Sequence, residues 1–198
     1  MDELQLYQLM ENILKHSTVI EGRFHVAENY GNDLNSGNLG DIISTEIKPK
    51  KYPISVILPP VDTPNYTAGW SRFRIEQFFL CTGQYTGSGA IKSPAKSTNT
   101  SKHPTRYDWK DMRECAIAFR QQFEEVIRAK GLLNQVRPVS GATDTVRRVS
   151  NMGNDRLNGV LIVWQLDLNF GCDIADYDEG AIAATQLPDE DIHPLHKH

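Results

Sequence analysis

The alternation of apolar and polar positions is clearest between Tyr107 and Cys172. From Trp109 to Lys130, apolar side chains recur at three- and four-residue steps, which is typical of a helix with one buried face. That face consists of Met112, Cys115, Ala116, Phe119, Phe123, Val126 and Ile127. Asp108 lies where an N-cap belongs, and Gly131 can adopt the left-handed conformation that ends a helix. We therefore predict one long amphipathic helix here.

Two strands are expected after this helix, separated from it by a loop through Pro138 and Gly141. The first spans Asp144–Asn151 and the second spans Gly159–Phe170. In the second strand apolar and polar residues alternate strictly, which indicates one buried face. Its apolar positions are Trp164, Leu166, Leu168 and Phe170. A helix packed on an antiparallel pair of strands is the predicted core.

Further elements are expected earlier in the chain. They are a helix at 1–17, strands at 19–27, 42–47, 52–58 and 70–81, and loops at 30–41 and 61–69. In the strand 70–81 one face is mainly apolar, and the other carries charged residues together with Phe78. We interpret an outward Phe78 beside charges as a sign that a partner covers this second face.

These elements predict an α+β fold, with an antiparallel or mixed sheet packed against two main helices. We expect a single domain over residues 1–172, which contains a long loop, and an extended C-terminal tail over 173–198.

The long loop, 83–106, is rich in Gly, Ser and Thr and contains no acidic residue. Its cationic residues are Lys92, Lys96, Lys102 and Arg106. Such a segment is either a tolerated surface insertion or an arm that orders against a neighbouring subunit or lines an anionic path. The tail has the opposite charge, with seven acidic residues and no lysine or arginine between 173 and 191. We expect this tail to dock on another chain.

The length and the net charge of the chain limit the classes of protein to which it can belong. The 198 residues fit one domain, and the net charge of −4 argues against a general nucleic-acid binder. The start of the chain lacks the pattern of a signal peptide, and no apolar run approaches the roughly 18 residues that a membrane helix needs. We therefore expect a protein that is made in a cytoplasm and does not enter a membrane. Cys81 and Cys115 are expected to be buried, reduced thiols.

Motifs of known chemistry are weak in this sequence. The stretch 87–93 resembles a phosphate loop, but it lacks the glycine before Lys92 and is not followed by an expected helix. The acidic run 173–180 lacks the ligand spacing of a calcium loop. His193, His196 and His198 could bind a metal only weakly at the end of the chain. We expect no catalytic residue, no cofactor and no metal.

Arg147 and Arg148 lie together in the strand expected at Asp144–Asn151. They could meet phosphate or an acidic partner surface, or they could simply form an exposed strand face. With Phe78 and the cationic residues of the loop 83–106, they complete our set of candidate residues for an interface or a DNA-lined channel.

The order of these elements resembles that of the small α+β proteins in the necks of long-tailed bacteriophages, most closely the tail-terminator (tail-completion) group. The resemblance covers the pattern of residues 1–172, and this chain departs from it in the loop 83–106 and the tail 173–198. It implies a structural protein of the virion without catalytic residues. Its subunits would form a ring, usually a hexamer, that caps the tail tube and joins it to the head connector, with possible non-specific contact between the ring lumen and DNA.

Two alternatives stay open. The chain could be a head-completion or connector protein that binds the portal, because sequence does not separate that role from a terminator. It could also be a small cytoplasmic enzyme or ligand-binding domain, with a site where Trp164, Asp167, Glu76 and Arg74 converge. That second alternative predicts a monomer or dimer with a concave apolar pocket.

Overall fold

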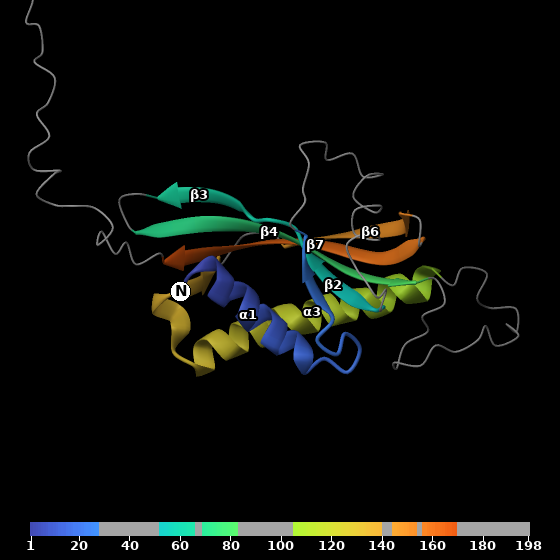
Figure 1. Ribbon diagram of the computed structural model, residues 1–198, viewed down its shortest axis with the longest axis horizontal. Coiled ribbons are helices and arrows are strands. Elements are labelled where there is room, and N and C mark those ends of the chain that lie inside the picture. The colour runs from blue at the N-terminus through green and yellow to red at the C-terminus, as the bar shows by residue number, and fades with distance from the viewer. Residues whose placement is uncertain (28–51, 66–68, 83–104, 140–143, 154–155, 170–198) are drawn as a thin grey trace, which may run out of the picture.

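The computed structural model describes residues 1–27, 52–65, 69–82, 105–139, 144–153 and 156–169 (Figure 1). Its helices are α1 (Glu3–Lys15), α3 (Thr105–Ala129) and the short 3-10 helix η1 (Leu132–Asn134). Its strands are β1 (Phe24–Val26), β2 (Ile54–Ile57), β3 (Val61–Asn65), β4 (Trp70–Thr82), β5 (Val136–Pro138), β6 (Thr145–Met152) and β7 (Leu157–Asn169). No described helix is both long enough and apolar enough to span a membrane.

The sheet is built around its two longest strands, β4 and β7. They pair antiparallel over their full length, from Trp70 opposite Asn169 to Thr82 opposite Leu157. β2 and β3 both pair with β4 along the side that faces away from β7. β5 and β6 both pair with β7 along the side that faces away from β4. β1 joins β2 in parallel, so the sheet of seven strands is mixed. The predicted α+β class is confirmed.

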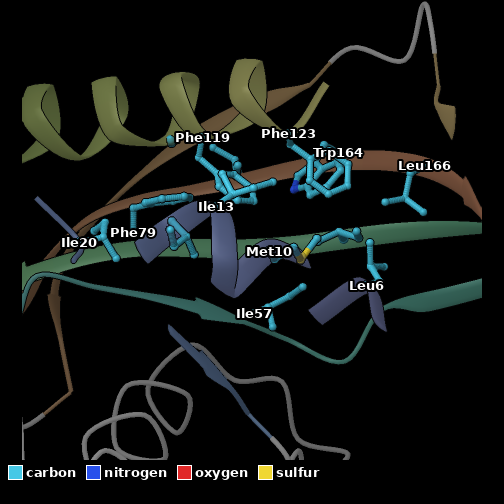
Figure 2. Close-up of a cluster of buried hydrophobic side chains, with 14 of the residues drawn as sticks. Leu6, Met10, Ile13, Ile20, Ile57, Phe79, Phe119, Phe123, Trp164 and Leu166 are labelled. Carbon is cyan, nitrogen blue, oxygen red and sulfur yellow. The ribbon is translucent and has the colours of Figure 1, made fainter. Parts of the chain in front are cut away.

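Both long helices pack on the same face of this sheet (Figure 1). Their apolar stripes meet the inward positions of β4 and β7, and Trp164 lies at the centre of the contact (Figure 2). The Trp164 ring meets Phe123 edge-on at a centroid distance of 5.1 Å and Phe119 at 6.4 Å. Such aromatic contacts add to the free energy gained by burying the rings. The amphipathic pattern of 109–130 thus predicted the face that α3 buries.

The sheet face away from the helices has two unlike halves. Over the C-terminal half of β4, Phe78 belongs to a second apolar cluster and is 3% exposed. The rest of this cluster is Ala27, Ile54, Val56, Leu58, Leu80, Met152 and Leu157. Over the N-terminal half of β4 the same face is charged, with ion pairs joining Arg72 to Asp167 and Arg74 to Glu76. Phe78 therefore packs within its own chain, and our expectation of an outward Phe78 beneath a partner was wrong.

Several sequence-based predictions of local structure were also wrong. The expected loop 61–69 contains β3, and the expected loop after α3 contains η1 and β5. α3 begins at Thr105, so Asp108 lies inside its first turn rather than at the N-cap. Gly131 does adopt the left-handed conformation just after α3, with φ of 66°. The strand expected at 42–47, most of the loop 83–106 and the tail 173–198 lie outside the described residues.

Candidate functional site

Strand β6 forms an edge of the described sheet. It pairs with β7 and with no other described strand, so its second side is not used by any described backbone partner. Its first four residues, Thr145–Arg148, are exposed. Arg148 lies opposite Val160, whose side chain belongs to the core on the helix side, so Arg147 projects to the other face. We call this outer side of Thr145–Arg148 the β6 edge.

The β6 edge is fastened to α3 near both of its ends. Trp109 donates its indole Nε1–H to the carbonyl oxygen of Val149 over 2.8 Å. About three helical turns later, Arg120 donates to the carboxylate of Asp144, just before β6, over 3.1 Å. α3 therefore runs antiparallel to β6 and holds it at two points, which fixes the edge against the body of the protein.

Cationic side chains gather where α3 begins beside β6. The guanidinium of Arg148 lies 5.5 Å from the centre of the Trp109 ring, which is within the range of a cation–π contact. Arg106 is exposed and precedes Trp109 by three residues, so the two are neighbours on the helix surface. Arg106 and Arg148 thus lie on the helix side of the β6 edge, and Arg147 lies on its other face; we call these three arginines the basic patch. The other cationic candidates, Lys92, Lys96 and Lys102, lie outside the described residues.

A groove of about 670 Å³ lies between α1, the turn after it, and α3. Its apolar lining includes Leu9, Ile13, Val19, Phe119 and Val126. Asp111 and Glu114 also line it, as does Lys130 from the other end of α3. The groove is open, with a mixed lining that can hold an apolar group beside a cation.

The ligand site expected beside Trp164 is not formed. Trp164 is 1% exposed and faces the helices, where the guanidinium of Arg120 lies 4.8 Å from its ring centre. Asp167, Glu76 and Arg74 alternate with the inward positions of β7 and β4, so they lie on the opposite face of the sheet. The register of the strands therefore separates Trp164 from the charged residues that we expected beside it.

A small polar cluster is buried where α3 crosses β4 and β7. Asp108 is 1% exposed and accepts a hydrogen bond from Asn158 Nδ2 over 3.0 Å. Burial raises the pKa of this carboxyl, the hydrogen bond from Asn158 opposes that rise, and the nearby Asp111 adds to it. Burial likewise raises the pKa of the Cys81 thiol, which donates to the Asn158 carbonyl oxygen over 3.4 Å.

This cluster is suited to a structural role. Asn158 also accepts a hydrogen bond from the backbone N–H of Asn151, so its side chain connects α3 to the β6–β7 turn region. Within the described ranges, no group of three or more His, Cys, Asp or Glu side chains is placed to hold a metal ion. Cys81 is fully buried, as we predicted, while Cys115 is only partly buried.

Comparison with protein-family models, with curated proteins and with solved structures finds no match for this chain.

Sequence reasoning identified Arg147 and Arg148 but missed the residues that position them. Trp109 was counted only as the start of a helix, and Arg120 and Asp144 were not singled out. An aromatic residue at the first turns of an amphipathic helix gives no signal that its N–H will reach a strand 40 residues later. Only the packing of α3 along β6 brings these residues together.

Proposed function

We propose that this protein is a structural subunit of the neck of a long-tailed bacteriophage, where it acts as the tail terminator. Copies of the chain would form a ring that caps the tail tube and joins it to the head connector, which places the protein in the virion. The observation that carries this proposal is the exposed β6 edge, which is hydrogen-bonded to α3 near both of its ends and bordered by the basic patch.

A ring subunit needs an interface that differs on its two sides, because each copy contacts the next in the same direction until the ring closes. An exposed strand edge is suited to one side of such an interface, since its backbone groups can pair with a segment from a neighbour. A mixed sheet with both helices on one face also agrees with the arrangement that the resemblance implies.

The decisive experiment is the mass of the purified full-length chain in solution, measured by light scattering across protein concentration and salt. We expect either a discrete ring of about six copies, or a monomer that becomes one when purified tail tubes are added. A monomer or dimer whose mass does not change with concentration, salt or tubes would contradict the proposal.

A head-completion protein is the nearest structural alternative. It would bind a portal ring rather than the tail tube, so the same mass measurement with added portals instead of tubes separates the two roles. Co-sedimentation with portals and no effect of tubes would move the assignment from terminator to connector.

A ligand-binding role is the alternative from another class, and the groove between α1 and α3 is the observation that favours it. An apolar floor with acidic groups beside it fits a small amine that carries an apolar group. A thermal-shift screen of such amines would test this role. A dose-dependent rise in Tm that is abolished by E114Q, together with a monomeric mass, would favour it.

A further inference from the structure

The basic patch and the C-terminal tail have complementary charges. Arg147 and Arg148 are exposed on the β6 edge, and Arg106 is exposed on the helix beside it. Residues 173–191 contain seven acidic side chains and no lysine or arginine. We infer that the β6 edge is the docking site for the acidic segment 173–191 of a second copy of this chain. This inference rests on the proposed ring and names the contact between its subunits.

The spacing of the charges supports docking as an added strand. Neighbouring residues of a strand point to opposite faces, so Arg147 and Arg148 place one charge on each side of the sheet. The tail contains the consecutive acids Asp178 and Glu179. If this pair lies beside the β6 edge as a strand, one carboxylate meets a guanidinium on each face. Backbone hydrogen bonds would then supply affinity, and the two ion pairs would set the register.

The position of β5 favours a tail from a second copy over the chain's own tail. β7 ends at Asn169. Leu161, which pairs with Arg147, lies eight residues earlier in β7, and these eight residues span about 26 Å along the strand. β5 pairs with this last part of β7 on the same side as β6. To reach its own β6 edge, the tail would have to reverse direction and pass around β5, a constraint that does not apply to a tail from a second copy.

Charge reversal at the patch is the first test. In the full-length double variant R147E/R148E we expect the association constant at low salt to fall at least about tenfold, because the interface would then carry like charges. R147K/R148K keeps the charge and should retain most of the association. R128E/K130E, which changes the net charge equally at the far end of α3, is the matched control and should assemble normally.

The second test asks whether the tail docks in trans. A full-length variant with all seven acids of 173–191 changed to Asn or Gln keeps an intact β6 edge but lacks the charged tail. Neither this variant nor R147E/R148E should form rings alone, yet an equimolar mixture should give a 1:1 heterodimer by native mass spectrometry. Separate monomers in the mixture would overturn docking in trans.

The outcomes separate this inference from the proposed function. If the unaltered chain never forms rings, with or without tail tubes, the proposed function fails. If rings form and R147E/R148E assembles as well as R128E/K130E, the proposed function stands and the docking inference is overturned. Unchanged assembly combined with weaker retention of R147E/R148E on duplex DNA would assign the basic patch to nucleic acid, and would also overturn docking.

Discussion

Trp109 and Val149 are 40 residues apart, yet a single hydrogen bond from the indole to a strand carbonyl joins them. Because Val149 lies in β6 at an edge of the described sheet, this bond connects the start of α3 to an edge strand. It also occupies a backbone acceptor near the C-terminal end of β6.

Replacing Trp109 with Phe tests the importance of this bond. W109F keeps a ring in the same place but removes the donor, so we expect the free energy of unfolding to fall by about 1 to 2 kcal/mol. Hydrogen exchange of the β6 amides should accelerate more than that of β4. W70F is the control. The Trp70 ring lies under Arg137, 4.1 Å from the guanidinium, and W70F should lower the free energy of unfolding less than W109F does. Equal losses for the two variants would contradict this assignment.

Gly159 is required for the close pairing of β7 with β4. A Cβ atom added there would lie 1.9 Å from the Phe79 carbonyl oxygen, and a strand backbone in the core cannot move aside. We expect G159A to lower the free energy of unfolding by about 3 kcal/mol or more, measured by urea denaturation. Gly131 is the comparison, because nothing lies within 4 Å of its added Cβ and only its φ of 66° is unfavourable. G131A should cost about 1 kcal/mol.

The buried carboxyl of Asp108 should make stability depend on pH. Its pKa is raised in the folded state, so the folded protein binds a proton more tightly than the unfolded chain. Its contribution therefore favours folding below about pH 4, the pKa of an unfolded Asp, and is lost as pH rises through the folded pKa. We expect D108N, whose amide oxygen can still accept from Asn158, to be more stable than the unaltered chain at pH 7.

This advantage of D108N should shrink as the pH is lowered toward 4, which denaturation at a series of pH values will show. E114Q is the control, because Glu114 forms an exposed ion pair with Lys110 over 3.6 Å. Its free energy of unfolding should change by less than about 0.5 kcal/mol. An advantage of D108N that persists unchanged at low pH would rule out titration of Asp108 as its cause.

The two described cysteines should differ in their reactivity toward iodoacetamide at pH 8. Burial first, then the carboxylates of Asp111 and Glu114, raises the pKa of Cys115 to about 11, so little of it is thiolate. Cys81 is completely buried and its pKa is raised further. We expect Cys115 to react at least about tenfold more slowly than in urea, and Cys81 more slowly still, as followed by peptide mass spectrometry. If Cys81 reacted equally fast in the native protein and in urea, its buried site would have to open to solvent in the native state.

The long elements were predictable because their side-chain periods are unambiguous. The apolar stripe of α3 and the alternation of β7 both identified the buried faces, including the inward position of Trp164. β3 was missed because Pro64 and Asp62 are poor strand formers. Pairing with β4 supplies the stability that its own sequence does not.

The candidate site was only partly predictable, for a related reason. Arg147 and Arg148 were visible as neighbouring charges in a strand, but their exposure depends on β6 lying at the sheet edge. Phe78 was misjudged because its burial depends on a second apolar cluster, which joins residues from segments that are far apart in the sequence. Contacts between segments far apart in the sequence therefore determine whether these side chains are exposed or buried.

The central place of β7 has a mechanical consequence. This strand leads directly into residues 170–198 and is paired with β4 on one side and with β5 and β6 on the other. Its interstrand hydrogen bonds lie across the strand direction, so tension applied through the C-terminal segment would load them in shear, many at once, rather than one after another. A subunit pulled by that segment would therefore resist extraction, because many hydrogen bonds would have to break together and the force would be distributed across the whole sheet.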